Sequence, residues 1–311
     1  MIDSDLQTVL ERLGGVSITA RQAVESVLAG SHRSVRRGLS VAFAGHRAYQ
    51  PGDDPRHLDW LVYARSDRYD VRLYDEETRL RATLLVDASG SHAVPEVGRR
   101  ARELAAALTV LLARQGDAVG LALLAGATAE HLPAASGSGH LAHLLERLAE
   151  HLPAGETALG TATEALAQHL PRRGLAVLIS DCLDSAASLE RTVRVLRHRR
   201  QEVRVLRVLH PDVEDFPLSG PVRCVGFEGE RPRRLDADRA RPWYKEAFAT
   251  HATALAAACH QWGAGLAVVR TDEDLGLALA RVLGGWGAPH GAAAAGPLPN
   301  GLGATGHGAT P

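Results

Sequence analysis

The feature that most constrains this chain is a series of short, continuously apolar segments separated by amphipathic ones. Apolar runs at residues 83–86, 118–124, 175–179 and 203–209 have the length of strands, and segments with apolar residues at helical spacing follow them. A strand that is apolar on both faces is typical of a parallel sheet covered by helices on both sides. We therefore predict an α/β fold with a doubly wound, mostly parallel, Rossmann-like sheet over residues 80–285.

The chain on either side of this sheet has a different character. Residues 1–79 begin with two short helical patterns and continue with two alternating segments, 38–44 and 69–74, which predict strands of a small N-terminal extension. Residues 286–311 are rich in Gly, Ala and Pro and show no periodicity. That composition predicts a disordered tail.

Composition limits the classes of partner and compartment. Hydrophobic residues make up 45% of the 311, and the formal net charge of −1 provides no global attraction to nucleic acid or to an anionic membrane. The three cysteines show no CxxC spacing, which argues against a disulfide framework and a cysteine zinc site. No apolar run approaches the roughly 20 residues of a membrane helix, and the N-terminus is acidic where a signal peptide is basic. We expect a soluble, cytoplasmic protein without membrane insertion, and the sequence does not indicate its oligomeric state.

An oxygen-rich loop follows the apolar run at residues 83–86. Asp87, Ser89 and Ser91 occupy alternate positions there. Because alternate residues of an extended segment project to one side, these three side chains can converge on one ion. The alternative to metal binding is a purely structural role, because Asp and Ser are common turn formers at the end of a strand.

A second acidic strand end, at Asp181, follows the run at residues 175–179. Ligands of an open parallel sheet bind beyond the carboxyl ends of its strands, where the strand order reverses. If the two strands are neighbours at that point, Asp87 and Asp181 face each other across it. Carboxylates with hydroxyls, including that of Thr157 just before a helix, form an incomplete shell of hard oxygens that suits Mg²⁺ or Mn²⁺.

The sequences DASGS at residues 87–91, GET at 155–157 and ISD at 179–181 resemble the metal-ion-dependent adhesion site of von Willebrand factor A domains. The resemblance implies a von Willebrand factor A-like fold and a metal-ligand set of Asp87, Ser89, Ser91, Thr157 and Asp181. One departure is His92, which stands where such motifs often continue with methionine and is not a ligand position of the pattern.

The segment upstream of the sheet resembles the hallmark of bacterial domain-of-unknown-function family 58, R-x-Y-x-x-G-D-D-x-R-x-x-D-W-x-x-x-A-R, with a von Willebrand factor A-like domain behind it. The match covers about residues 30–285 in the right order, although Ala42 stands where a Glu is common. Its hallmark positions here are Arg47, Tyr49, Gly52, Asp53, Asp54, Arg56, Asp59, Trp60 and Arg65. The resemblance implies a non-enzymatic partner or adaptor of a MoxR-type AAA+ ATPase in the assembly or maturation of a client.

The hallmark residues admit two interpretations. Paired Arg and Asp side chains give directional, bidentate contacts and could form a face for a protein partner. They could also form an internal salt-bridge network that pins the extension to the sheet, and we favour this for Asp59, Trp60 and Arg65. Cys182, beside Asp181, has no histidine motif spaced to activate it and is interpreted as a small buried residue.

Three functional hypotheses remain open from the sequence. The first is the interaction module, in which a partner's carboxylate completes the coordination of a bound Mg²⁺ or Mn²⁺. The second is a metal-dependent hydrolase that uses Asp87 and Asp181 to activate water, although neither motif loop offers an evident general base. The third is a vestigial metal site, with residues 45–75 binding the partner. Nucleotide binding by this chain is improbable because it has no Walker-type phosphate loop and no GxGxxG after a strand.

Overall fold

The computed structural model describes the sheet-forming part of the chain and shorter segments before it. The described residues are 43–48, 62–63, 69–74, 80–151, 153, 155, 158–226 and 231–284, of which 43–48 and 70–74 are described as backbone. The two helices expected at the N-terminus and the C-terminal tail lie outside these residues. The division into residues 1–79, 80–285 and 286–311 therefore stays a prediction.

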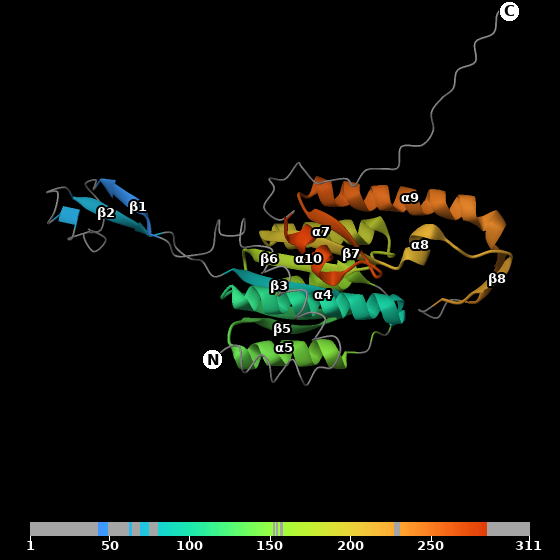
Figure 1. The fold of residues 1–311 in the computed structure, drawn as a ribbon, viewed down its shortest axis with the longest axis horizontal. Helices are drawn as coiled ribbons and strands as arrows, with labels where there is room; N and C mark the ends of the chain where they lie inside the picture. Colours follow the sequence, from blue (N-terminus) through green and yellow to red (C-terminus); the bar gives the residue numbers. More distant parts are fainter. Residues whose placement is uncertain are drawn as a thin grey trace, which may run out of the picture.

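A six-stranded sheet forms the centre of the structure (Figure 1). Its strands are β3 (Arg81–Asp87), β4 (Ala118–Ala125), β5 (Thr128–Ala135), β6 (Gly174–Ser180), β7 (Gln201–Leu209) and β10 (Gly265–Arg270). Their spatial order is β10-β7-β6-β3-β4-β5, and every neighbouring pair is parallel except β4 with β5. The strand order reverses between β3 and β6, because β4 lies on one side of β3 and β6 on the other. The predicted doubly wound, mostly parallel α/β fold is confirmed.

Helices cover both faces of this sheet. One face carries α4 (Pro95–Arg114), α5 (Ser138–Glu150) and α10 (Leu275–Gly284), and the other carries α6 (Leu159–Ala167), α7 (Ala186–His198) and α9 (Ala237–Gln261). Successive residues of β3 alternate between the two faces, with Leu84 and Val86 packed on the α4 side and Leu85 on the α6 side. This explains why the strands read as continuously apolar. Among the described helices, none combines the length and apolarity that a membrane span requires.

Two antiparallel strand pairs lie outside the main sheet. β1 (Phe43–Ala48) pairs with β2 (Asp70–Tyr74), and β8 (Pro221–Cys224) pairs with β9 (Arg233–Asp236). β1 includes Phe43 and Ala44 of the expected segment at residues 38–44, and the rest of that segment lies outside the described residues. A short helix after β7, α8 (Pro211–Asp215), was not expected from the sequence.

Helix α4 is held closely against the loop that follows β3. Gly98 of α4 lies directly beside the backbone of His92, so that a Cβ at this position would collide with the His92 carbonyl oxygen. Farther along the same helix, the buried Arg100 donates hydrogen bonds through Nη2 to the carbonyl oxygens of Thr271 (2.8 Å) and Glu273 (2.7 Å). These contacts tie α4 both to the β3 loop and to the segment between β10 and α10.

Truncation of the buried core is expected to be costly on the central strands. Leu178 of β6 is 0% exposed, so Leu178→Ala removes buried methyl groups and leaves a cavity, which costs about 2–5 kcal/mol of the free energy of unfolding. Leu277 of α10 is 69% exposed, and Leu277→Ala should cost less than about 0.5 kcal/mol. Chemical denaturation measures both, and similar costs for the two variants would contradict this description of the core.

Candidate metal centre

The chain turns sharply after β3 into a short 3-10 helix, η3 (Gly90–Ala93). Asp87, at the end of β3, is 2% exposed, and its Oδ1 accepts a hydrogen bond from the Ser89 backbone N–H (3.0 Å). The hydroxyl oxygens of Ser89 and Ser91 lie 3.1 Å apart. The structure therefore brings together the three side chains that the alternate spacing predicted, and their role as metal ligands stays a prediction.

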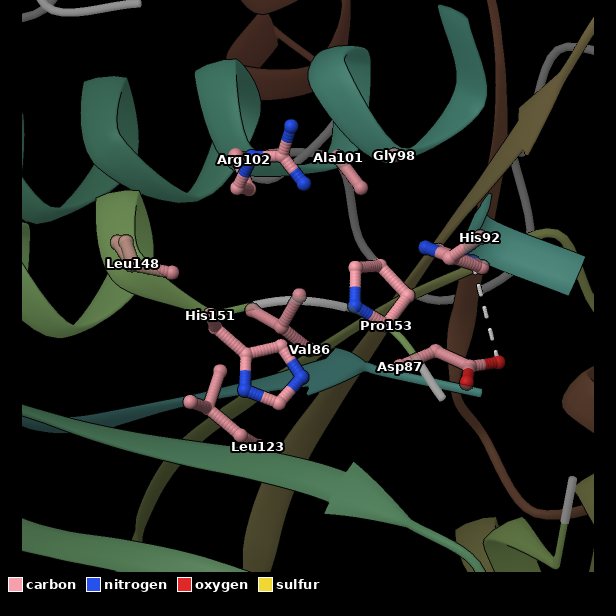
Figure 2. A pocket seen from close by; sticks show the side chains of 10 residues that line it. All are labelled: Val86, Asp87, His92, Gly98, Ala101, Arg102, Leu123, Leu148, His151 and Pro153. Carbon is pink, nitrogen blue, oxygen red and sulfur yellow. Dashed lines mark ion pairs between the residues drawn. The ribbon is translucent and has the colours of Figure 1, made fainter. Parts of the chain in front are cut away.

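A small cavity lies behind this loop, between β3, α4 and the segment after α5 (Figure 2). Asp87, His92, Arg102 and His151 are among its lining residues. Its volume is about 10 Å³, which is about enough for one water molecule. The buried Nε2 of His151 has no hydrogen-bond partner in the part of the chain that the structure describes. The cavity can thus hold a water molecule but is far too small for an organic substrate.

The end of β6 supplies the second carboxylate. Asp181 is 4% exposed, and its Oδ1 accepts from the backbone N–H of Leu183 (3.2 Å). The preceding residue, Ser180, donates its hydroxyl proton to Asp87 Oδ2 (2.6 Å) and accepts from the backbone N–H of Cys182 (2.9 Å). As predicted, the two acidic strand ends lie side by side where the strand order reverses. Ser180 connects them directly.

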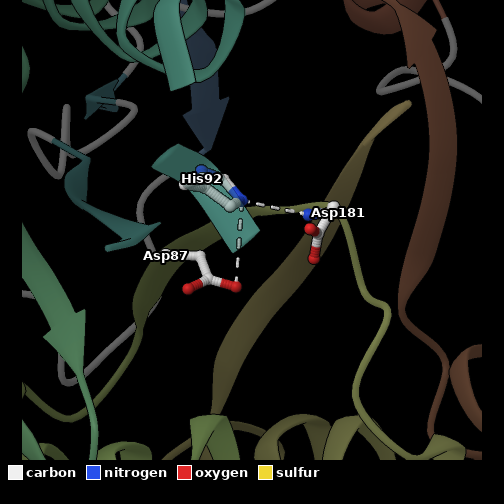
Figure 3. Close-up of side chains that lie close together, drawn as sticks. All are labelled: Asp87, His92 and Asp181. Carbon is white, nitrogen blue, oxygen red and sulfur yellow. Dashed lines mark hydrogen bonds and ion pairs between the residues drawn. The ribbon is translucent and has the colours of Figure 1, made fainter. Parts of the chain in front are cut away.

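His92 of η3 completes a buried group that the sequence did not predict (Figure 3). Its imidazole is 2% exposed, with Nε2 3.9 Å from Asp87 Oδ2 and 3.2 Å from the backbone nitrogen of Asp181, which donates to it. One potential ligand atom from each of Asp87, His92 and Asp181 lies within 4.8 Å of the others. The motif pattern passes over His92 because it lists only oxygen ligands; the signal available in the sequence was a histidine directly beside Ser91.

A buried arginine on β7 lies behind the second carboxylate. Arg207 donates through Nε to the backbone oxygen of Asp181 (3.1 Å), and its guanidinium lies 5.1 Å from the centre of the Phe248 ring on α9. Its Nη2 has no hydrogen-bond partner among the described residues. Burial lowers the pKa of the Arg207 guanidinium, which nevertheless places a positive charge beside the site.

The electrostatics of the site are dominated by burial. Desolvation raises the pKa of the Asp181 carboxyl above its ordinary value, the negative charge of Asp87 raises it further, and His92 and the Ser91 hydroxyl oppose the shift. The ionised form of Asp181 is therefore costly in the metal-free protein. A bound cation would reverse that cost, because it interacts favourably with the charged form alone.

The fifth predicted ligand, Thr157, lies outside the described residues, so its position relative to Asp87 stays a prediction. Its neighbourhood is partly visible through Gly155, whose carbonyl oxygen accepts a hydrogen bond from the Gly90 backbone N–H (2.8 Å). Gly155, two residues before Thr157, thus contacts the loop after β3.

Of the nine hallmark residues, the structure describes only Arg47. Arg47 lies on β1, opposite Val71 of β2, and its side chain is outside the description. The other hallmark residues, Tyr49, Gly52, Asp53, Asp54, Arg56, Asp59, Trp60 and Arg65, also lie outside the described residues. Both interpretations, a partner face and an internal salt-bridge network, therefore remain predictions.

Comparison with known proteins identifies the family. The family model described as "Protein of unknown function DUF58" matches residues 45–254. The chain belongs to the DUF58 family. This DUF58 protein is also 32% identical over 280 residues to "Uncharacterized protein Mb1516" of Mycobacterium bovis, which covers 88% of each chain. The resemblance drawn from the hallmark segment is confirmed.

Solved structures with low sequence identity share part of the architecture. The conserved hypothetical protein BatB from Bacteroides thetaiotaomicron is 16% identical, with a TM-score of 0.43, and the alignment covers 66% of this chain and 98% of BatB. The SpRpn10 VWA domain is 12% identical, with a TM-score of 0.38, covering 64% of this chain and 94% of that domain.

Asp181→Asn is expected to stabilise the metal-free protein at neutral pH. The pKa of Asp181 is raised in the folded state, so its carboxyl lowers the free energy of unfolding once it must ionise. This destabilisation is absent below the ordinary carboxyl pKa of 3.8 and grows as the pH rises from there through the folded-state pKa. The stability gain of Asp181→Asn should therefore be largest near neutral pH and shrink as pH falls toward about 4. Urea unfolding in EDTA measures it, with Asp212→Asn, whose side chain is 66% exposed, as control. A gain that is constant with pH would contradict the assigned cause.

The cysteines should differ sharply in reactivity. Cys182 and Cys259 are buried, and burial raises the pKa of both thiols, that of Cys259 to about 12, whereas Cys224 is exposed. Since the thiolate is the reactive form, a disulfide reagent should label one thiol per native chain and three after denaturation. Rapid labelling of Cys182 in the native protein would contradict its interpretation as a buried structural residue.

Proposed function

We propose that this DUF58 protein is a non-enzymatic interaction module that binds a protein partner through a divalent cation. In this proposal Asp87, Ser89, Ser91, Thr157 and Asp181 hold Mg²⁺ or Mn²⁺, and a carboxylate of the partner occupies an open coordination position. The proposed partner is a MoxR-type AAA+ ATPase, with the complex acting in the assembly or maturation of a client. The ATPase follows from the family resemblance stated for the hallmark segment.

The observation that carries the proposal is the pair of buried carboxylates, Asp87 and Asp181, on adjacent parallel strands. Buried carboxylates are normally paired with cations, because an isolated buried charge is costly. The hydroxyls of Ser89 and Ser91 add hard-oxygen donors beside Asp87. This donor set fits Mg²⁺ or Mn²⁺ that retains water or accepts an outside oxygen ligand.

The local charge supports an anionic partner group. Metal binding requires both carboxylates to be ionised. With Arg207 beside Asp181, the two carboxylates and a divalent ion leave one positive charge in a buried setting. An incoming Asp or Glu side chain would neutralise that charge, and the interaction is strengthened by the low local dielectric.

One observation favours the hydrolase alternative, and two others oppose it. His92 places an imidazole beside Asp87, which supplies the kind of group that a general base requires. Its Nε2 already accepts the Asp181 N–H, however, and the adjacent cavity holds about one water molecule rather than a substrate. The interaction module is therefore the better supported proposal.

Partner binding should depend on both the cation and Asp87. With the candidate ATPase immobilised, wild-type protein in Mg²⁺ should bind, and EDTA or Asp87→Ala should weaken binding at least about tenfold, as expected for the loss of a metal ligand. Asp212→Ala, which removes an exposed carboxylate on α8, is the matched control and should bind like wild type.

Three outcomes of this experiment would redirect the proposal. Binding that is indifferent to EDTA and to Asp87→Ala would transfer the partner site to residues 45–75 and leave the metal site vestigial. Absence of binding would remove the ATPase as partner. Turnover of phosphoesters that Asp87→Ala abolishes would favour the hydrolase.

A further inference from the structure

His92 lies where a metal ligand could lie, although the adhesion-site sequence pattern contains only oxygen ligands. It belongs to η3, the short helix that also positions Ser91, and the neighbouring Gly98 lets α4 press against its backbone. In Figure 3, dashed lines join the imidazole to the Asp87 carboxylate and to the backbone nitrogen of Asp181. With Nε2 3.9 Å from Asp87 Oδ2, the side chain lies at the edge of direct interaction with that carboxylate.

The spacing of the three groups is close to that of a metal shell. Ligands bound at about 2.0–2.2 Å to one ion are separated from each other by about 3–4 Å. The candidate atoms of Asp87, His92 and Asp181 all lie within 4.8 Å of one another, so small side-chain rotations would bring them to one ion. All three residues are buried, which limits how far these side chains can move away.

An imidazole nitrogen changes which ions such a site prefers. A shell of carboxylates, hydroxyls and water suits Mg²⁺, whereas imidazole suits borderline transition ions, and the affinity for Zn²⁺ exceeds that for Mn²⁺ at a site of this kind. Carboxylates and histidine both bind Zn²⁺, and three protein ligands with an open fourth position is the arrangement of catalytic zinc sites.

We propose that Asp87, His92 and Asp181 are the three protein ligands of the ion at this site, in place of the hydroxyls, and that the site prefers Zn²⁺ to Mg²⁺. The proposal rests on Asp87 and Asp181 of the metal site put forward above and changes its ion from Mg²⁺ or Mn²⁺ to Zn²⁺. To bind a metal, Nε2 must leave the Asp181 N–H, and that bond is long at 3.2 Å, near the upper limit for an N–H donor. The open fourth position is the one that the partner's carboxylate would occupy.

A positioning role for His92 is the rival account. In that case the imidazole only holds the β6 end through its hydrogen bond to Asp181, and its loss weakens the binding of every ion alike. His92→Gln separates the two roles, because the Gln side-chain oxygen can accept the Asp181 N–H but supplies no imidazole nitrogen. His92→Met fills a similar apolar volume without either group.

The test is titration calorimetry of Zn²⁺ and Mg²⁺ with wild type, His92→Gln, His92→Met and Asp87→Ala, all of the full chain. Wild type should bind Zn²⁺ more tightly than Mg²⁺. Both His92 variants should lower the Zn²⁺ affinity by about tenfold or more while the Mg²⁺ affinity changes by less than about threefold. Zn²⁺ that binds to Asp87→Ala is bound by histidines outside this site, and this background is subtracted from the binding measured for the other proteins.

Tighter Mg²⁺ than Zn²⁺ binding in wild type would overturn the inference, as would equal losses for both ions in His92→Gln. Zn²⁺ binding that persists unchanged in Asp87→Ala would also overturn it. Circular dichroism of each variant confirms folding, and His92→Met provides the readout if His92→Gln does not fold. These results are separate from the test of the proposed function, which measures partner binding and turnover and does not depend on which ion binds more tightly.

Discussion

The parallel pairing of β3 with β6 is the interaction on which the candidate site depends. Its register aligns Val86 with Ile179, so that the residue beside Asp87 is Ser180 and the second carboxylate, Asp181, lies one residue farther on. The Ser180 hydroxyl donates to Asp87 and accepts from the Cys182 backbone N–H. A slip of one residue would exchange the faces of every β6 side chain, so the burial of the sheet and the geometry of the site are fixed together.

This arrangement concentrates polar groups in an apolar core. Asp87, His92, Asp181 and Arg207 are all buried at the carboxyl ends of three adjacent strands. Hydrogen bonds from Ser180, from the backbone and from Arg207 satisfy part of this group. At Asp181, burial raises the pKa of the carboxyl against the opposing effects of His92, the Ser91 hydroxyl and the Leu183 N–H. A protein that retains such a cluster at a loop end is expected to use it, because apolar residues would make a more stable core there.

The sequence predicts most of this fold, because its apolar runs and helical periodicity are local patterns that correspond to the buried strands and amphipathic helices of the structure. It also predicts that Asp87 and Asp181 meet, since strand ends converge at the reversal of strand order. It does not predict His92 or Arg207. The orientation of His92 depends on how η3 turns against α4, and Arg207 lies in a strand whose pattern only indicates burial. The expected strand at residues 38–44 continues to Ala48 in the structure, because pairing with β2 decides where β1 ends.

Helix α4 gives the site a mechanical connection across the molecule. Gly98 leaves no space between the helix and the His92 backbone, and Arg100 fastens the same helix to the carbonyl oxygens that follow β10. A force applied at the β3 loop is therefore shared between the loop, α4 and the far edge strand, rather than borne by the loop alone.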